Sequence, residues 1–338
     1  MSTDLQQTVT IHVHYPLASG RMLLRTDQDW GRNVEPIAVS DDGLHAEFSL
    51  ALDRPYLYFK PVIAEGNAFR WSVGHNYLVV AGRHQVRDIY PYFYSSATCT
   101  ACELQDLDSS PGSQGHAFRV FYPPGHEENT LKRYPVLYMQ DGQNLFFSGE
   151  AFLGVHWKIR ETLVLLDAMN LVDKVIVVGV YPYHREDDYT LPGYEAYGRF
   201  LVENLKPHID REYRTLSAPE NTAVMGSSLG GVVSFYLAWQ YPEVFGMAAC
   251  MSSTFGWQDN LRQRVMDEPR RNIRLYLDSG YPNDNYEVTR DLRALLAARG
   301  FREGLDLMYL AFPEALHSEQ FWAMRAHIPV QFLFGQRS

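Results

Sequence analysis

The stretch Thr222-Ala-Val-Met-Gly226-Ser227-Ser228-Leu229-Gly230-Gly231-Val-Val-Ser-Phe-Tyr236 joins an apolar, strand-like run to a helix-like run through a G-x-S-x-G pentapeptide. This pattern is typical of a nucleophile elbow, in which a serine lies in the sharp turn between a strand and a helix. The crowded turn favours glycine at positions 226 and 230, on either side of Ser228. We therefore predict that Ser228 exposes its hydroxyl at a sheet edge, and that the Leu229 amide, at a helix N-terminus, can stabilise an oxyanion.

Composition and charge narrow the class of protein. With 338 residues, of which 46% are hydrophobic and 14% aromatic, the chain can bury one large core or two smaller ones, and two domains are expected. The formal net charge of −10, without any block of lysine or arginine, argues against a nucleic-acid partner. The first residues lack a signal-peptide pattern, and no apolar run reaches the length of about 18 residues that spans a bilayer. We expect a cytoplasmic protein with no membrane partner, and the oligomeric state stays open.

The sequence motifs that could bind a metal are incomplete. The three cysteines agree with a reducing compartment, and Cys99 and Cys102 form one C-x-x-C pair, which is only half of a zinc site. His12 and His14 share one face of a predicted strand, but the sequence shows no third ligand beside them, so solvent exposure is expected. We therefore expect no metal and no cofactor.

The first hundred residues are rich in β-strand signals. Apolar Val9, Ile11 and Val13 alternate with polar residues, which is the period of a half-buried strand. Several short strands separated by turn residues, with no helical stretch between them, predict a small all-β sandwich over residues 1–100. The predicted strands cover residues 9–15, 44–50, 56–60 and 76–80.

From about residue 117 apolar strand-like runs alternate with helical windows. This alternation predicts a doubly wound α/β domain with a mostly parallel sheet over residues 117–338. The predicted strands cover residues 134–139, 175–180, 223–225, 273–277 and 307–311. The predicted helices cover residues 157–169, 194–209, 232–240 and 287–299. Residues 101–116 are expected to form a linker, with a hinge in the turn-rich stretch 109–115.

A candidate general base lies downstream of Ser228. A serine hydroxyl is a weak nucleophile that needs a base, and the base needs an acid to orient it. In enzymes with a nucleophile elbow these residues follow in the order Ser, acid, His. The histidines after Ser228 are His317 and His327. We predict that His317 is the base, because it follows the last predicted strand in a loop, whereas His327 falls inside a helical stretch.

The acid is expected after the predicted strand 273–277, where Asp278, Asp284 and Glu287 are candidates. Asp278 ends the strand and suits a local cap or a hydrogen bond at the end of the ladder. Asp284 lies in a loop of turn-forming residues, which lets its carboxylate bend toward the histidine. We favour Asp284 and keep Asp278 as the alternative.

A second oxyanion donor is expected after the predicted strand 134–139, in the run Gln140-Asp141-Gly142-Gln143-Asn144. Gly142 permits a tight turn, so the amide of Gln143 or of its neighbour can point at the acyl oxygen. Asp141 and Asn144 are either substrate contacts or residues that bond within the loop through Asx turns.

These motifs together resemble a known family. The resemblance rests on residues 121–125, 134–146, 176–180, Arg185, 207–215, 226–231 and the pattern His317-Ser-Glu-x-x-Trp322, within about 115–335. They are similar to the "Putative esterase" family of α/β-hydrolases, which includes enterochelin esterases, esterase D and feruloyl or acetylxylan esterases. The resemblance implies a serine esterase with Ser228, Asp284 and His317 as triad and the amides of Gln143 and Leu229 as oxyanion hole. One departure is Gln140, where relatives often carry histidine before Asp-Gly.

The N-terminal part is more weakly similar to the immunoglobulin-like or starch-binding-like modules that precede such esterases. Trp30 and Trp71 are candidates for stacking on sugar rings, although aromatic residues in small sandwiches more often serve in cores and interfaces. We expect this module to pack against the hydrolase through Tyr90-Pro-Tyr-Phe-Tyr94 and to restrict its cleft.

Substrate contacts are less well marked. Arg185 follows a predicted parallel strand, where α/β folds bind ligands, and is either a contact to a polar acyl group or part of a solvated loop. Trp157, Trp257 and Trp322 either line the cleft or belong to the core. The predicted activity is hydrolysis of a bulky, sugar-linked or siderophore-type ester through an acyl-enzyme. The alternative is an inactive hydrolase scaffold that binds a carbohydrate or another ligand.

Overall fold

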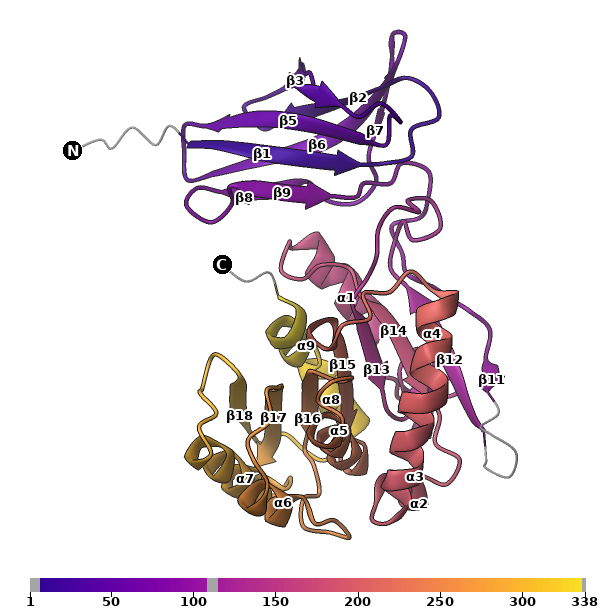
Figure 1. Ribbon diagram of the computed structural model, residues 1–338, viewed down its shortest axis with the longest axis vertical. Helices are drawn as coiled ribbons and strands as arrows, with labels where there is room; N and C mark the ends of the chain where they lie inside the picture. Colours follow the sequence, from indigo (N-terminus) through magenta and orange to yellow (C-terminus); the bar gives the residue numbers. More distant parts are fainter. Residues whose placement is uncertain (1–6, 108–114, 336–338) are drawn as a thin grey trace, which may run out of the picture.

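The computed structural model describes residues 7–107 and 115–335 and has an all-β part followed by an α/β part (Figure 1). The hinge predicted at 109–115 lies outside the described residues except for residue 115. The fold is an α/β-hydrolase preceded by a small β-sandwich, as the sequence predicts.

The β-sandwich consists of two facing sheets. The four-stranded sheet has the order β4-β5-β1-β9. The five-stranded sheet has the order β3-β2-β6-β7, and its fifth strand, β8, also pairs with β6. Along β1, Val9, Ile11 and Val13 are buried between the sheets, whereas His12 and His14 lie on the outer face. The strands are β1 (Gln7–His14), β2 (Arg21–Thr26), β3 (Asp29–Val34), β4 (Ala38–Val39), β5 (His45–Leu52), β6 (Tyr56–Glu65), β7 (Ala68–Trp71), β8 (Tyr77–Val80) and β9 (Val86–Ile89).

The α/β part is built on a nine-stranded sheet of order β10-β12-β14-β13-β15-β16-β17-β18, with β11 also paired to β12. The strands from β14 to β18 in this order are parallel to their neighbours, and β12 is antiparallel to β14, β10 and β11. The strands are β10 (Thr100–Ala101), β11 (Gln105–Leu107), β12 (His116–Tyr122), β13 (Val136–Met139), β14 (Ile176–Val180), β15 (Thr222–Ser227), β16 (Met247–Met251), β17 (Arg274–Tyr281) and β18 (Leu307–Pro313).

The segment predicted as a linker therefore belongs partly to the large sheet. Strands β10 and β11 lie within residues 101–116 or at their border, and they pair with β12 through backbone hydrogen bonds. Short strands with mixed composition carry little periodicity, which is why the sequence does not reveal them.

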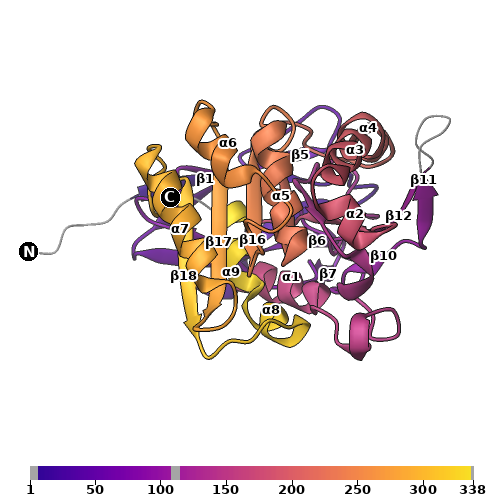
Figure 2. The same cartoon turned by 90° about the horizontal axis from the view of Figure 1, so that it is seen from below.

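Helices cover both faces of the large sheet (Figure 2). One core layer contains side chains of α3, α4, α5, α6 and α7, and the other contains side chains of α1, α8 and α9. Helix α5 carries the buried run that follows Ser228. The helices are α1 (Ile159–Ala168), α2 (Arg185–Tyr189), α3 (Gly193–Phe200), α4 (Lys206–Glu212), α5 (Leu229–Gln240), α6 (Leu261–Asp267), α7 (Tyr286–Ala298), α8 (Glu319–Arg325) and α9 (His327–Phe334). The π-helical segment η3 (Leu201–Leu205) joins α3 to α4, and η1 (Gly142–Asn144), η2 (Phe152–Gly154) and η4 (Pro219–Asn221) are single 3-10 turns.

The sandwich contacts the α/β part through the segment Tyr90–Tyr94, as predicted. Glu128 accepts hydrogen bonds from the backbone N–H groups of Phe93 (2.6 Å), Tyr94 (2.8 Å) and Ser95 (2.7 Å). Asn129 donates from Nδ2 to the carbonyl oxygens of His14 and Pro91, at 2.8 Å each.

These contacts lie at the edge of the sheet where the parallel strands begin. Asn129 precedes β13, and Asn170, which donates from Nδ2 to the Asn76 carbonyl at 3.0 Å, precedes β14. The candidate catalytic residues follow the opposite, carboxyl ends of the strands, where α/β folds place their ligands. The sequence led us to expect that the sandwich restricts the cleft. That expectation is wrong, because these contacts place the sandwich at the edge of the sheet opposite to the candidate catalytic residues.

Candidate active site

Ser228 lies in a strained turn between β15 and α5. Its backbone dihedrals are φ 55° and ψ −122°, a region that residues with side chains rarely adopt and that persists where the surroundings enforce it. A Cβ at Gly226 would lie 2.5 Å from the backbone of Gly230, so the turn can close only with glycine at position 226. The G-x-S-x-G motif thus forms the turn predicted from the sequence.

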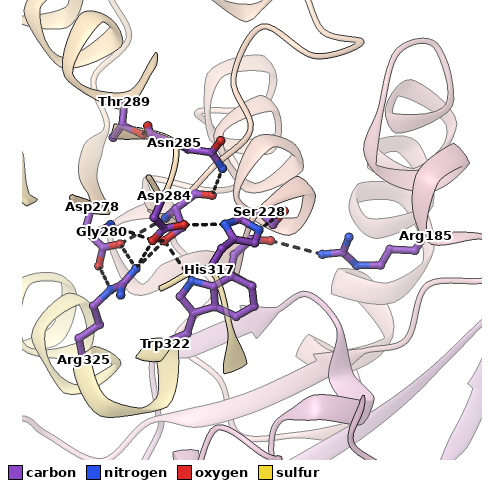
Figure 3. A network of polar contacts seen from close by, with 12 residues as sticks. Arg185, Ser228, Asp278, Gly280, Asp284, Asn285, Thr289, His317, Trp322 and Arg325 are labelled. Atoms are coloured by element: carbon purple, nitrogen blue, oxygen red, sulfur yellow. Dashed lines mark hydrogen bonds and ion pairs between the residues drawn. The ribbon is translucent and has the colours of Figure 1, made fainter. Parts of the chain in front are cut away.

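The structure brings Ser228, His317 and Asp284 into one line (Figure 3). Nε2 of His317 lies 3.0 Å from Oγ of Ser228, and its Nδ1 lies 2.6 Å from Oδ1 of Asp284. Serine, histidine and aspartate come from the loops or turns after β15, β18 and β17 respectively. The geometry suits proton transfer from the hydroxyl to an imidazole that a carboxylate orients.

The second oxygen of Asp284 is held from the opposite side. Oδ2 accepts hydrogen bonds from Oγ of Ser252 and, at 2.8 Å, from the backbone N–H of Gly280. Burial alone would raise the pKa of Asp284, but the hydrogen bonds from His317, Ser252 and Gly280 outweigh it and lower that pKa below its usual value. Asp284 is therefore held as a carboxylate.

The Asp278 carboxylate binds a different set of side chains. Its two oxygens lie 3.1 Å from Nη2 and Nε of Arg325, and Oδ2 also accepts from the Tyr276 hydroxyl at 2.8 Å. Burial raises the pKa of Asp278, and Arg325 opposes that rise. Asp278 thus forms a buried ion pair with Arg325, on the side of Asp284 that lies away from Ser228 (Figure 3).

Arg325 and Ser252 are the residues that sequence reasoning missed. Nη2 of Arg325 donates to Ser252 Oγ and lies 3.5 Å from Oδ2 of Asp284. Ser252 follows β16, and Arg325 ends α8. The one available signal was an arginine on the apolar face of a helix, because such a residue needs a buried partner.

The oxyanion candidates lie at two turns of the same sheet edge. Leu229 is the first residue of α5, so its N–H has no partner inside the helix. Gln143 lies in the single turn η1 after β13, beside Gly142. A Cβ at Gly142 would lie 2.6 Å from the Gly179 backbone, so this turn packs directly on β14.

An ion pair fixes the start of that turn. Asp141, with φ 54°, accepts hydrogen bonds from Nε and Nη2 of Arg185 at 2.8 and 2.9 Å. Its own N–H donates to the Tyr189 hydroxyl at 3.0 Å. Arg185 is thus engaged by a carboxylate of the protein in a two-pronged contact.

The remaining predicted contact residues lie in different environments. Asn144 is buried and accepts from the backbone N–H of Phe152 at 2.9 Å. Trp322 is buried, donates Nε1 to Ser252 at 3.0 Å and packs edge-on against His317 with ring centres 4.9 Å apart. Trp157 is also buried, whereas Trp257 is exposed in the segment after β16. Trp257 is therefore the tryptophan of this group that is open to a substrate.

Other predicted candidates lie away from this line. His327 is exposed at the start of α9, and Glu287 is exposed in the first turn of α7. Gln140 lies behind the elbow, where its side-chain oxygen accepts from the Tyr197 hydroxyl and its N–H donates to the Met225 carbonyl at 2.9 Å. Cys99 and Cys102 are free thiols. In the residues that the structure describes, no helix is long and apolar enough to cross a membrane.

Comparison with known proteins identifies the class of molecule. The model of the family described as "Putative esterase" matches residues 113–322. The uncharacterized protein YbbA of Bacillus subtilis (strain 168) is 20% identical over 248 residues, which are 65% of this chain and 92% of that protein. An endo-1,4-beta-xylanase/feruloyl esterase of Xylanibacter ruminicola is 25% identical over 266 residues, 74% of this chain but 35% of that longer protein.

Solved structures share the fold. A ferulic acid esterase superposes with a TM-score of 0.59 at 17% identity, covering 70% of this chain and 98% of its own. The enterobactin esterase FES of Shigella flexneri superposes with a TM-score of 0.57 at 14% identity, covering 96% of this chain and 92% of its own.

The fold and the comparisons together define an α/β-hydrolase that acts on esters. The chain belongs to the "Putative esterase" family, whose model covers more than half of it. It is a carboxylic ester hydrolase.

Proposed function

We propose that this esterase works through an acyl-enzyme formed on Ser228. The observation that carries the proposal is the line of hydrogen-bond distances from Ser228 Oγ to His317 Nε2, 3.0 Å, and from His317 Nδ1 to Asp284 Oδ1, 2.6 Å. Oγ attacks the ester carbonyl while Nε2 of His317 accepts the hydroxyl proton. The imidazolium then donates that proton to the departing alcohol oxygen.

The second half of the cycle uses the same groups in reverse. Water loses a proton to His317 and attacks the acyl carbon, and the bond to Oγ breaks as His317 returns the proton to Ser228. Both tetrahedral intermediates carry an oxyanion, which we assign to the N–H groups of Leu229 and Gln143. Asp284 keeps the Nδ1 proton of His317 in place and stabilises the imidazolium.

Arg185 supports this mechanism through the turn η1, which carries the proposed oxyanion donor Gln143. Its guanidinium holds both oxygens of Asp141, which lies two residues before Gln143. A donor that is fixed before the reaction stabilises the oxyanion without having to reorganise. In this proposal Arg185 is a positioning residue, and a direct contact to the acyl group is a second role that its partly exposed side chain permits.

We also propose that the substrate is a bulky ester. Large apolar side chains are exposed on several loops at the carboxyl ends of the strands, where an ester bound at Ser228 would extend. They are Phe152, Leu153, Tyr183, Trp257, Tyr281 and Leu316. Aromatic acyl or alcohol groups would bury this surface. Proteins with the same fold include a ferulic acid esterase and an enterobactin esterase, which is consistent with an aromatic ester.

The test compares p-nitrophenyl acetate, p-nitrophenyl butyrate and methyl ferulate with wild type and Ser228→Ala. The variant should lose several orders of magnitude in kcat, since the nucleophile is absent. Ser49→Ala, an exposed serine on the sandwich strand β5, is the matched control and should retain full activity. A fluorophosphonate probe should label wild type and not Ser228→Ala. Equal turnover or equal labelling in both proteins would contradict the acyl-enzyme.

A further inference from the structure

A cluster of histidines and one aspartate lies on the outer face of the β-sandwich. His12 and His14 alternate along β1 and therefore point to the same face of the sheet. In the parallel pair of β1 with β9, His12 is the partner of Asp88, and in the antiparallel pair of β1 with β5, His14 is the partner of His45. The register of three neighbouring strands thus brings four side chains to one place.

The distances in this cluster are short. Oδ1 of Asp88 lies 2.6 Å from Nε2 of His14 and 3.2 Å from Nδ1 of His12. These three ligand atoms all lie within 4.8 Å of one another. Tetrahedral Zn²⁺ with bonds of about 2.0–2.2 Å needs ligand atoms roughly 3.3 Å apart. The contact between His14 and Asp88 must open slightly, and the Asp88 side chain, 54% exposed, is free to make that adjustment.

The surroundings resemble the second shell of a metal ligand. Nδ1 of His14 lies 2.6 Å from Nδ1 of His45, so it can donate its proton there while Nε2 binds an ion. The ring of Tyr90 stacks on His14, with centres 4.7 Å apart and planes 18° apart. The side chain of His14 is only 17% exposed, and both of its ring nitrogens have a defined direction.

We propose that His12, His14 and Asp88 form a binding site for a divalent transition-metal ion, with Zn²⁺ as the best fit. Two imidazoles and one carboxylate are ligands that this class of ion accepts, and a fourth position stays open to water. Glu47 is the partner of His12 on β5, so its carboxylate lies on the same face of the sheet as the cluster and can approach that position.

The proposed role is structural. The ligands join β1, the first strand of the sandwich, to β9, its last, and their sequence separations are 74 and 76 residues. An ion that closes so long a loop removes much conformational freedom from the unfolded chain. Strand β9 also leads directly into the Tyr90–Tyr94 segment that contacts the α/β part. Metal binding would thus stabilise the sandwich edge that docks on the hydrolase.

The site is independent of ester hydrolysis. The cluster belongs to the sandwich, which docks at the edge of the large sheet opposite to Ser228. Replacing His14 or Asp88 should leave esterase activity unchanged at a temperature where the protein stays folded. Activity therefore reports whether a variant retains its native hydrolase part, separately from metal binding.

The experiment is calorimetric titration of ZnCl₂ into the full chain after treatment with EDTA. Wild type should bind one equivalent at this cluster, and its Tm should rise with Zn²⁺ concentration. His14→Ala and Asp88→Ala should lose that equivalent, and His45→Ala should weaken binding by about 10- to 100-fold. His327→Ala, an exposed histidine at the start of α9, is the control and should bind as wild type does.

Two results would overturn the proposal. One is the absence of a titratable Zn²⁺ equivalent in folded, active wild type. The other is an equivalent that persists unchanged in His14→Ala and Asp88→Ala, because the ion would then lie elsewhere in the protein. Replacing Zn²⁺ by Co²⁺ adds a spectroscopic test, since a tetrahedral site gives strong visible absorption that the two variants should lack.

Discussion

Gly280 donates its backbone N–H to Oδ2 of Asp284 at 2.8 Å, on the side of the carboxylate that faces away from His317. The end of strand β17 therefore fixes the rotation of the acid, and the Ser252 hydroxyl, which follows β16, binds the same oxygen. Neither donor requires a charge on the histidine. In the proposed mechanism, Asp284 is already oriented before His317 becomes protonated.

The two aspartates near the end of β17 should respond differently to the same substitution. Asp284→Asn removes the charge that faces His317, and kcat should fall by about 10⁴-fold, the scale seen when a triad acid is neutralised. Asp278→Asn leaves the buried Arg325 without its main counter-charge, and the free energy of unfolding should fall by about 3–5 kcal/mol. Steady-state kinetics and urea denaturation on both variants measure the two effects.

The comparison of these two variants also tests the alternative acid. If Asp278→Asn abolishes turnover in protein that is still folded while Asp284→Asn keeps near-normal kcat, the roles of the two aspartates must be exchanged. Circular dichroism at the assay temperature verifies that each variant is folded.

Arg185→Lys should impair catalysis although it conserves the charge. A lysine cannot make the two parallel hydrogen bonds by which Arg185 holds Asp141, so the turn that carries Gln143 loses its support. Misplacement of a catalytic donor by about 1 Å costs up to about 100-fold, and we expect kcat to fall by about 10- to 100-fold with a smaller change in KM. An effect confined to KM would instead favour a direct contact between Arg185 and the substrate.

Two half-exposed tryptophans form a matched pair for the substrate prediction. Trp257 is 44% exposed near the catalytic edge, and Trp71 is 36% exposed on β7 of the sandwich. Trp257→Ala should raise KM for methyl ferulate more than for p-nitrophenyl acetate, because a bulky aromatic ester loses more contact area. Trp71→Ala should leave both KM values unchanged, and an altered preference in that variant would show that the sandwich does reach the substrate.

Acidification should weaken the junction between the sandwich and the α/β part through Glu128. Burial raises the pKa of this carboxyl, but the backbone N–H groups of Phe93, Tyr94 and Ser95 and the Tyr15 hydroxyl outweigh it, so its pKa lies below the usual value. Since the folded pKa is depressed, the stabilisation is complete above the unfolded pKa of about 4.3 and is lost as pH falls through the folded value.

The measurement is Tm as a function of pH for wild type, Glu128→Gln and Glu127→Gln. Glu128→Gln should have a lower Tm than wild type at pH 7. Its Tm should also fall less on acidification, because it lacks the titrating carboxyl group. The neighbouring Glu127 is exposed, so Glu127→Gln should follow wild type. Parallel curves of Tm against pH for wild type and Glu128→Gln would show that Glu128 does not contribute to the pH dependence of stability.

The sequence predicted the features of the site that depend on local motifs. Ser228 lies in a turn whose glycines are dictated by close backbone contact, and His317 and Asp284 follow strands with clear apolar runs. The structure places His317 within hydrogen-bond distance of both Ser228 and Asp284. Arg325 and Ser252 could not be predicted in this way, because their partners are brought together only by the packing of α8 on the strand ends.

The position of the sandwich also could not be predicted from the sequence. It depends on whether the loop that carries Glu128 and Asn129 lies at the edge where the parallel strands begin or at the edge where they end, and composition does not encode that. Strand β9 is short and carries Arg87 and Asp88 among its four residues, so it has no clear alternation. Without β9, the partner of His12 and His14 was not visible.

The sandwich docks at the edge where the parallel strands begin, and this has a practical consequence for immobilising the protein or fusing it to another. A chain immobilised or fused through its sandwich would present the sheet edge that carries Ser228 outward, away from the support. Large or polymeric esters would then approach Ser228 without obstruction from the attachment, and turnover should be insensitive to what the sandwich is joined to.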